Sequence, residues 1–351
     1  MDQMPLKVIA LGLSEPIGDL LECAWQKDAF EIAAVADPDV ERAAAAARRY
    51  ECQTFDDVRQ LIVQSQGDVF FVGSPAHLSA EPIQLALEKQ YHLFKTAPAG
   101  MNFEQAAQWI RDSARQQRRY ITVQPGRFHP LVDHLRDILD RSEVNFWHLI
   151  TGVCHIPQPP TEPDQRWLYD PSLAGGGVLL RNAYGLIDEL ILCFGLPQQV
   201  YSQMSNQAPD RQQRMSTTED TAVVVMRFSD TLIAQISASR TLGPPRMHLR
   251  IHGKDQFVTL TPEVLTVCSH DDEVIEEVHD SSTPGGWAER LLDNFVKNLR
   301  DPDQNHLFPP PETDLKTMAV LEAAYLSAKT GMPEEPSRIL QLAGFKADGF
   351  W

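Results

Sequence analysis

Long apolar runs are missing from this sequence. No stretch approaches the roughly 18 apolar residues needed to cross a bilayer, so we expect no membrane partner. The start, MDQMPLKVIALGL, lacks the basic residues, long apolar stretch and small-residue cleavage site of a secretory signal. The five cysteines are scattered and form no C-x-x-C, which argues against a disulfide framework and against a zinc site. These absences favour a cytoplasmic protein without a bound metal.

Positive charge is also scarce. The chain has 31 Lys and Arg against 48 Asp and Glu, a net charge of −17 that would repel a phosphate backbone. The dense basic stretches, at 48–50 and 115–120, follow helical patterns and are interpreted as solvated helix faces. We therefore expect no nucleic-acid partner.

With 351 residues, the chain is long enough for two domains. Residues 1–124 alternate short β-branched runs with longer helical patterns, as in KVIALGL, EPIGDLLECAWQK and FEIAAVADPD. DVFFVGSP is continuously apolar, as expected of a parallel strand covered on both faces. This half predicts a Rossmann-type, doubly wound parallel sheet, an α/β fold.

The pattern changes at residue 125. Residues 125–351 contain one or two helical segments, among them a helix expected over 182–195, followed by six stretches of period two between 221 and 279. These stretches predict an open, mostly antiparallel sheet of an α+β domain that serves substrate binding and oligomerisation. The chain ends in further helical patterns, which we expect to pack back on the first domain.

The turn after the first strand holds a partial phosphate-binding motif. Only Gly12 and Gly18 of VIALGLSEPIG match G-x-G-x-x-G, and Ser14 stands where the second glycine belongs. Glu15 would either occupy the anion site at the helix start itself or repel a phosphate placed there. Asp37 ends the second strand, where an acid would bind the ribose hydroxyls of NAD and disfavour the 2′-phosphate of NADP. The alternative is an ordinary tight turn followed by a strand-end Asp.

Several segments together resemble the Gfo/Idh/MocA family, the relatives of glucose-fructose oxidoreductase and inositol dehydrogenase. The similarity spans almost the whole chain in order, and its segments are FEIAAVADPDVERAAAAARRY, DVFFVGSPAHLSAEPIQLALEKQYHLFKTAPAG, VQPGRFHP, RWLYDPSLAGGGVLLRNAYGLIDELILCFGLPQQV, EDTAVVVMRFSDTLIAQISASR and LEAAYLSAKTGMP. The resemblance implies an NAD(P)-dependent oxidoreductase of sugars, polyols and related molecules. It also implies cofactor contacts from Ser74, Pro75, His77 and Pro98.

The catalytic positions of the family are occupied by other residues here. The resemblance puts Ala97 at the lysine of E-K-P, with Thr96 at the glutamate. It puts Arg181 and Gly185 at the acid and the histidine that follow the glycine triplet 175–177, with Asp188 at a later acid, and Ser79 at the histidine of T-P-x-x-x-H. Hydride leaves a carbon only as its hydroxyl proton is taken, so a base or acid must contact that oxygen. We expect ordinary sugar dehydrogenase activity to be weak or absent.

Three residues are candidates for a rearranged catalytic site. Lys95 lies two residues before Ala97 on the same strand face, Tyr184 follows the glycine triplet, and His155 ends a strand. Each has a structural alternative, in which the side chain packs, pairs with an acid or lies in solvent. His129 is interpreted as a helix-start residue.

Arg181 and Asn182 are the candidates for substrate binding, on a helix face that Arg181 would share with Tyr184. Arg181 suits a carboxylate or a phosphate but is a poor general base, and a plain salt bridge is its alternative.

Three functions stay open for the interdomain cleft. They are an oxidoreductase with a rearranged site, a non-catalytic binding or regulatory relative, and an enzyme of another reaction class with an anionic ligand. We expect NAD rather than NADP if a dinucleotide still binds. Family resemblance and the apolar stretches AVVVMRF and LIAQISA favour a homodimer or tetramer through the second sheet.

Overall fold

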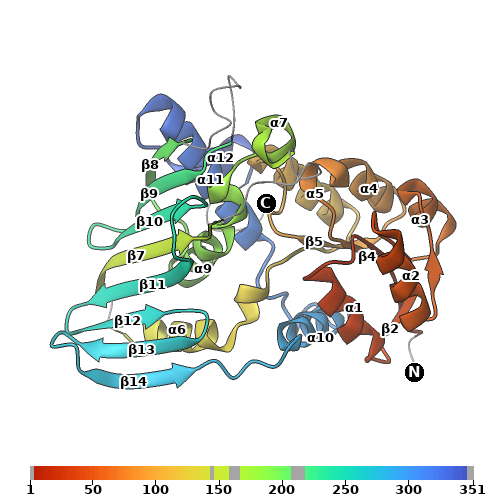
Figure 1. The fold of residues 1–351 in the computed structure, drawn as a ribbon, viewed down its shortest axis with the longest axis horizontal. Helices are drawn as coiled ribbons and strands as arrows, with labels where there is room; N and C mark the ends of the chain where they lie inside the picture. The colour runs from red at the N-terminus through yellow and green to blue at the C-terminus, as the bar shows by residue number, and fades with distance from the viewer. Residues whose placement is uncertain (1–3, 143–145, 158–166, 207–217, 346–351) are drawn as a thin grey trace. The chain divides into compact units, whose positions relative to one another are not determined.

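The computed structural model describes residues 4–142, 146–157, 167–206 and 218–345. Their contacts divide the chain into two compact units (Figure 1). The first unit comprises 1–100, 104–125 and 283–311, so it includes a segment from far along the chain beside the expected 1–124. The second comprises 101–103, 126–282 and 312–351.

The first unit is built on a six-stranded parallel sheet in the order β3-β2-β1-β4-β5-β6. The expected Rossmann-type sheet is thereby confirmed. Its strands are β1 (Leu6–Leu11), β2 (Phe30–Ala36), β3 (Gln53–Thr54), β4 (Val69–Val72), β5 (His92–Thr96) and β6 (Tyr120–Val123). Its helices are α1 (Ile17–Trp25), α2 (Val40–Arg49), α3 (Val58–Gln64), α4 (Ala76–Glu88), α5 (Phe103–Arg115) and α10 (Gly286–Arg300).

The centre of this sheet is continuously apolar. All four residues of β4 and of β6 are buried, as are the last four of β1, because helices cover both faces of a parallel sheet. The late segment of the chain adds α10, which packs on α1. A lysine of the α1–β2 turn, Lys27, joins the two by donating to Glu289 and Asp293.

The second unit is built on an eight-stranded sheet in the order β14-β13-β12-β11-β7-β10-β9-β8. Only the β7–β10 pair is parallel, so the expected mostly antiparallel sheet is confirmed. Its strands are β7 (Trp147–His155), β8 (Gln199–Ser205), β9 (Thr221–Arg227), β10 (Ile233–Ser239), β11 (Arg246–Gly253), β12 (Gln256–Leu260), β13 (Val264–Ser269) and β14 (Val274–His279). Its helical segments are η1 (Pro125–Phe128), α6 (Pro130–Arg141), α7 (Pro171–Ala174), α8 (Val178–Arg181), α9 (Tyr184–Phe194), α11 (Glu312–Thr330) and α12 (Pro336–Leu342).

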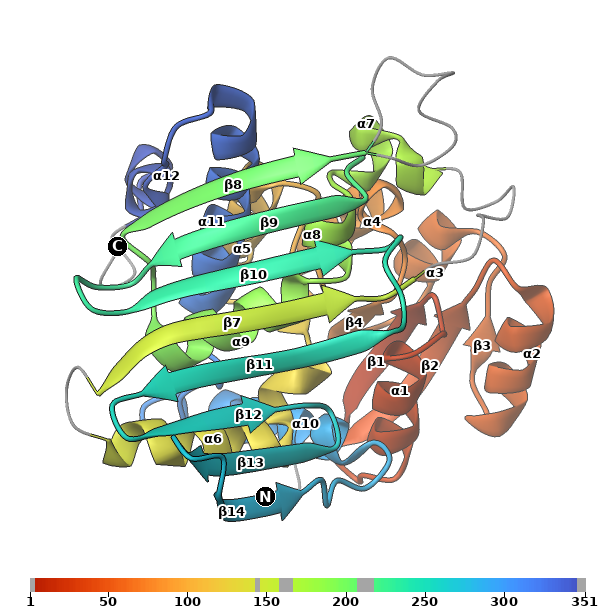
Figure 2. The same cartoon turned by 60° about the vertical axis from the view of Figure 1, so that its left-hand side comes forward.

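One face of this sheet carries the helices and the other is open (Figure 2). Strand β9 shows the difference, since Ala222, Val224 and Met226 are buried under the helices, whereas Val223 and Val225 are exposed on the open face. Strand alternation thus assigns each side chain of the sheet to one face. The expected helix-start role of His129 is confirmed, because its Nδ1 accepts from the N–H of Leu131 at the start of α6.

The helix expected over 182–195 is confirmed as α9, but the expectation that Arg181 shares a face of this helix with Tyr184 is wrong. The segment forms two helices, α8 and α9, separated by Asn182 and Ala183, whose N–H groups both donate to the carbonyl of Val178. This turn ends α8 at Arg181, so Arg181 and Tyr184 do not share one helix face. Among the helices of the described ranges, none is both long and apolar enough for a membrane span.

Candidate functional site

Two strand-end turns of the first unit touch backbone to backbone. Gly12 follows β1 with φ of +74°, and a Cβ there would lie 2.9 Å from the carbonyl carbon of Gly73. A Cβ on Gly73, which follows β4, would lie 2.2 Å from the carbonyl oxygen of Gly12. Only glycine fits at either position, so this contact fixes the two turns at which a Rossmann fold places its dinucleotide.

The first turn of α1 satisfies part of its own hydrogen-bonding capacity. The N–H groups of Ile17 and Gly18 both donate to the carbonyl of Ser14, at 3.0 and 3.4 Å. The side chains of Ser14 and Glu15 are exposed. Helix N-termini bind phosphates through such N–H groups, so a pyrophosphate here competes with the Ser14 carbonyl.

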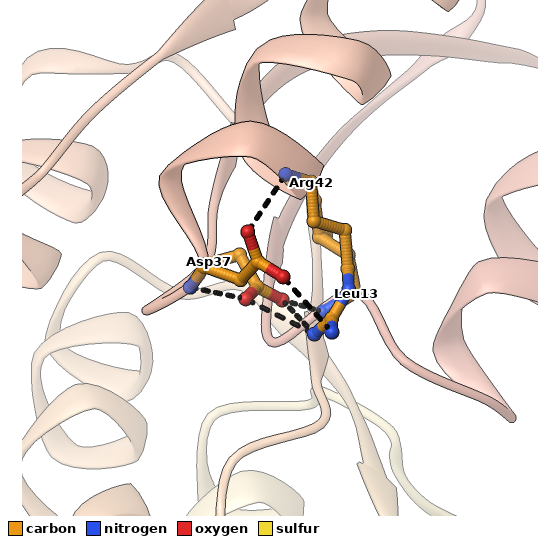
Figure 3. Close-up of polar contacts among 4 residues, drawn as sticks. Leu13, Asp37 and Arg42 are labelled. Atoms are coloured by element: carbon orange, nitrogen blue, oxygen red, sulfur yellow. Dashed lines mark hydrogen bonds and ion pairs between the residues drawn. The ribbon is translucent and has the colours of Figure 1, made fainter.

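The carboxylate of Asp37 is enclosed by donors (Figure 3). It accepts from the N–H of Leu13 at 2.6 Å, from the N–H of Asp39 at 2.8 Å and from Nη1 of Arg42 at 3.2 and 3.3 Å. The Asp37 side chain is 2% exposed and that of Arg42 is 46% exposed. The acid therefore holds the β1–α1 turn and pairs with Arg42.

The turn after β4 is held from within. The Ser79 hydroxyl donates to the carbonyls of Ser74 and Pro75 at 2.9 Å, and Ser79 is fully buried. His77 lies half-buried in the first turn of α4, next to this pair of residues. The serine that stands at the family's histidine thus acts in the turn itself.

The end of β5 shows where Lys95 and its neighbours lie. Lys95 is 1% exposed, and its ammonium donates to the carbonyl of Thr96 at 2.7 Å and to the Thr96 hydroxyl at 3.3 Å. Ala97 and Pro98 follow the strand, joined by a cis peptide bond. Proton transfer by Lys95 would require this buried ammonium to leave its carbonyl acceptor.

The glycine triplet of the second unit is required by close packing. A Cβ would lie 2.1 Å from the carbonyl oxygen of Met101 at Gly175, 2.0 Å from the hydroxyl of Tyr325 at Gly176, and 1.9 Å from the carbonyl oxygen of Glu219 at Gly177. The Glu219 carboxylate accepts from the N–H groups of Gly177 and Leu179 and from the Tyr325 hydroxyl. The triplet therefore places α8 against Glu219, a residue that the sequence reasoning missed.

Arg181, Asn182 and Tyr184 lie together after the triplet, on the covered side of the sheet. The Asn182 carbonyl accepts from Sγ of Cys154 on β7 at 3.3 Å. Tyr184 is 2% exposed, whereas Arg181 is exposed and its guanidinium lies over the ring of Trp167, 4.6 Å from the centroid. Neighbouring atoms that partly desolvate the guanidinium, followed by the charge of Arg240, lower the pKa of Arg181 to about 10, so Arg181 stays cationic at neutral pH.

The structure does not bring His155 to this group. Because Cys154 points to the helix-covered face, alternation along β7 puts His155 on the open face. Its Nε2 lies 3.1 Å from the hydroxyl of Ser237, on the neighbouring strand β10. His155 is therefore separated by the sheet from Arg181 and Tyr184.

Asp188 belongs to a buried ion network. Its carboxylate accepts from Nε and Nη2 of Arg127 at 2.6 and 2.7 Å and from the Thr317 hydroxyl at 2.8 Å. Nη2 of Arg127 also donates to Asp314 at 2.5 Å. Burial alone would lower the pKa of Arg127, but the two carboxylates raise it well above its ordinary value. The network joins η1, α9 and α11 and leaves Asp188 bound within the core. Across the described ranges no group of three or more His, Cys, Asp or Glu side chains is placed to hold a metal ion.

Comparison with known families agrees with this architecture. A model described as "Oxidoreductase family, NAD-binding Rossmann fold" matches residues 17–124, and one described as "GFO/IDH/MocA C-terminal domain" matches residues 132–259. The first match begins after β1 and its turn, the part in which the phosphate-binding motif is incomplete.

A curated relative and two solved structures show the same similarity. The relative is a dTDP-3,4-didehydro-2,6-dideoxy-alpha-D-glucose 3-reductase of Saccharopolyspora spinosa, 29% identical over 158 residues, which are 44% of this chain and 46% of that protein. The chain spans about half, or less, of the length of the curated relatives it matches. Levoglucosan dehydrogenase in complex with NADH and levoglucosan has a TM-score of 0.81 at 18% identity, with 94% of this chain and 99% of that chain covered. The WlbA dehydrogenase of Bordetella pertussis, in complex with NADH and UDP-GlcNAcA, has a TM-score of 0.78 at 17% identity, with 95% and 99% covered.

The parallel sheet with its touching glycine turns and the open sheet with its glycine triplet define a two-unit protein with a Rossmann-type first unit. The chain belongs to the Gfo/Idh/MocA family of oxidoreductases, whose N-terminal part is an NAD-binding Rossmann fold.

Proposed function

We propose that this protein is a dinucleotide-binding member of the family in which the usual proton-transfer residues are replaced. Ordinary sugar or polyol dehydrogenase activity is then weak or absent. The observation that carries the proposal is the identity of three residues, Ala97, Arg181 and Gly185, at the positions that the resemblance aligns with the family's lysine, acid and histidine. A methyl group, a guanidinium and a hydrogen atom cannot take the proton of a substrate hydroxyl.

The first unit retains the framework for a dinucleotide, which would supply a hydride acceptor or donor when bound. Gly12, Ser14 and Gly18 line the turn that would hold the pyrophosphate, and Asp37 lies at the strand end that would hold the adenosine ribose. Ser74, Pro75, His77 and Pro98 are the further candidates for cofactor contact. The backbone of the turns has the geometry that a dinucleotide needs, but some of its hydrogen-bonding groups already have partners. The Ser14 carbonyl accepts from N–H groups at the start of α1, and Arg42 donates to the Asp37 carboxylate.

NAD is the favoured dinucleotide. Asp37 places a carboxylate at the end of β2, where it accepts from ribose hydroxyls and repels a 2′-phosphate. Arg42 opposes this preference, because its half-exposed guanidinium partly neutralises Asp37. Only the arginine of this pair is exposed, so a ribose that takes its place at Asp37 returns the Arg42 guanidinium to solvent.

The remaining proton-handling candidates are in unfavourable places. Lys95 is buried against Thr96, Tyr184 is enclosed, and His155 faces the open side of the sheet. Arg181 is suited to binding rather than to proton transfer, since its pKa of about 10 keeps it charged.

Titration with NADH and with NADPH, followed by nucleotide fluorescence, tests the dinucleotide proposal. We expect saturable binding with tighter binding of NADH. The Asp37→Asn variant should weaken NADH binding about tenfold, because hydrogen bonds to charged groups contribute about 1.5–3 kcal/mol. Asp230→Asn, which makes the same chemical change at an exposed pair with Arg227, should leave binding unchanged.

If neither NADH nor NADPH binds, the dinucleotide proposal is refuted. A second experiment tests the catalytic part. The double variant Ala97→Lys and Gly185→His should not gain polyol turnover if the surroundings of both positions have been remodelled, and turnover in this variant would show that only these two groups are missing.

A second candidate is favoured by one observation, the guanidinium of Arg181. It suits a protein that binds an anionic small molecule, either as a non-catalytic regulatory relative or as an enzyme of another reaction class. Binding of an anion without binding of NADH or NADPH would select this candidate.

We also propose a homodimer or tetramer through the open face of the second sheet. Several large apolar side chains are exposed there, namely Leu149, Tyr201, Val223, Val225 and Ile233. A contiguous apolar patch of this kind is typical of a protein interface. Light scattering after gel filtration should give a dimer or tetramer, and Val223→Lys with Val225→Lys should dissociate it. A monomeric wild-type protein would contradict the proposal.

A further inference from the structure

An arginine that no motif indicated lies at the end of β10. The chain leaves the sheet at Arg240, whose N–H donates to the carbonyl of Asp220 at 3.0 Å. Its guanidinium lies over the ring of Tyr169. Arg240 is only 8% exposed, yet its Nη2 is buried without a hydrogen-bond acceptor among the described residues. A buried cationic donor without an acceptor is costly, so its retention points to a ligand.

Arg181 supplies a second guanidinium beside the first. Each of the two arginines is stacked on an aromatic ring, and the two rings belong to Trp167 and Tyr169, two positions apart on one segment. Cζ of Arg181 lies 4.6 Å from the ring centroid of Trp167, and Cζ of Arg240 lies 4.5 Å from that of Tyr169. Stacking fixes the planes of the guanidinium groups but leaves their N–H edges available.

The surroundings of the two arginines are built from backbone contacts. Thr218 ties the ring-bearing segment to the start of β9, because its N–H donates to the carbonyl of Tyr169 at 3.2 Å and its hydroxyl to that of Leu168 at 2.9 Å. The triplet and α8 are tied to the same point by Val178, whose N–H donates to the carbonyl of Glu219. Both arginines are therefore carried by elements that meet at the β9–β10 pair.

No carboxylate of the described residues makes an ion pair with Arg181 or Arg240. The neighbouring acid Glu219 directs its oxygens to two N–H groups of the triplet segment and to Tyr325. Two like charges without a shared acid repel each other, and a bound oxyanion would remove that repulsion. Guanidinium groups match the oxygens of carboxylates and phosphates through paired N–H donors.

We propose that Arg181 and Arg240 form a binding subsite for the anionic oxygen group, carboxylate or phosphate, of a small ligand. This inference rests on the proposed function in one respect, since it takes the bound ligand to be the protein's substrate. It assigns that substrate to the acidic or phosphorylated sugars and related hydroxy acids, and it excludes neutral sugars as good ligands.

Isothermal titration calorimetry of the full chain tests the subsite with four probes. D-gluconate presents a carboxylate, D-glucose 6-phosphate and inorganic phosphate present phosphate, and D-glucose presents neither. We expect binding of at least one anionic probe, no binding of glucose, and weaker binding at high salt because the contact is ionic. The anion that binds more tightly identifies the source of the oxyanion.

Variants at the two arginines locate the binding. Arg240→Gln and Arg181→Gln should each reduce the affinity for the anionic probe at least tenfold. Arg181 is exposed, so its variant remains informative if Arg240→Gln does not fold. Arg227→Gln is the control, because Arg227 is exposed and paired with Asp230, and this variant should leave the affinity unchanged.

Parallel titrations with NADH separate this inference from the proposed function. Both arginine variants should bind NADH as the wild type does. Failure of every anionic probe, or equal affinities in the wild type and in the Arg181 variant, would overturn the subsite whatever the result with NADH. Loss of NADH binding with retained anion binding would refute the dinucleotide proposal and leave the subsite intact.

Discussion

The buried network around Arg127 makes a sharp prediction for the substitution Asp188→Asn. The carboxylate of Asp188 accepts three hydrogen bonds, two of them from Arg127 and one from Thr317. An amide has one oxygen, and its NH2 group would face a donor. At least one charge-assisted bond is therefore lost, and a buried guanidinium loses one of its two carboxylates.

The magnitude follows from these losses. A hydrogen bond to a charged group contributes about 1.5–3 kcal/mol, and breaking a buried ion pair costs about 3–5 kcal/mol. Asp314 remains bound to Arg127 at 2.5 Å and moderates the loss, so we expect the free energy of unfolding to fall by about 3–4 kcal/mol. For a unit of this size the melting temperature should fall by about 10 °C.

Calorimetric and urea unfolding of the variant measure this change. Asp230→Asn is the control, because its pair with Arg227 is exposed and the substitution should change stability by less than about 0.5 kcal/mol. Nucleotide binding per folded molecule should be unchanged in both variants. A loss below about 1 kcal/mol for Asp188→Asn would refute the reasoning that the network is structural.

Three further predictions concern cofactor preference and pH. Arg42→Ala should raise the ratio of NADH to NADPH affinity by about tenfold, because the substitution frees the Asp37 carboxylate and removes a cation that a 2′-phosphate would use. An unchanged affinity ratio in paired titrations would contradict this prediction. Burial, followed by the charge of Asp188, raises the pKa of Glu189 from 4.5 to about 8. The folded state therefore binds the proton more tightly than the unfolded state, and the free energy of unfolding should fall as pH rises from about 4.5 to 8. Urea unfolding across this pH range should show a flatter slope for Glu189→Gln, with a stabilisation of about 2 kcal/mol at pH 8. Burial, followed by the charges of the neighbouring arginines, lowers the pKa of His92 from 6.5 to about 4. The unfolded state therefore binds the proton more tightly, and about 3 kcal/mol of the free energy of unfolding should be lost as pH falls from 6.5 to 4. An unfolding free energy that does not change over this range would contradict this prediction.

The two sheets could be predicted from the sequence because each leaves a periodic signal. Continuously apolar runs such as VFFV on β4 indicate a parallel strand covered on both faces, and the structure buries all four residues. The stretch TAVVVMR on β9 has its buried residues at every second position. These periodic patterns do not show which face of a strand the helices cover. β7 carries apolar residues on both faces, so the sequence did not reveal that His155 points away from the helices.

Side-chain partners over long separations were beyond sequence reasoning. Arg127 is 61 residues from Asp188 and 187 residues from Asp314, and three charged residues at such distances form no motif. Arg240 was missed for the same reason, as a single arginine at a strand end. The break between α8 and α9 was missed because neither proline nor glycine occurs in 178–184, and the break follows from two N–H groups that share the Val178 carbonyl. The dinucleotide turn was located by its glycines, but the competition from Ser14 and Arg42 became visible only in the structure.

The central claim is that this family member lacks a proton-transfer set for plain alcohols. Its most direct test is steady-state turnover of myo-inositol and D-glucose at saturating NAD and NADP, read as nucleotide reduction and normalised to nucleotide-binding sites measured in the same preparation. We expect no reduction above the rate without enzyme, with NADH binding intact. Rapid nucleotide reduction with either neutral polyol would contradict it.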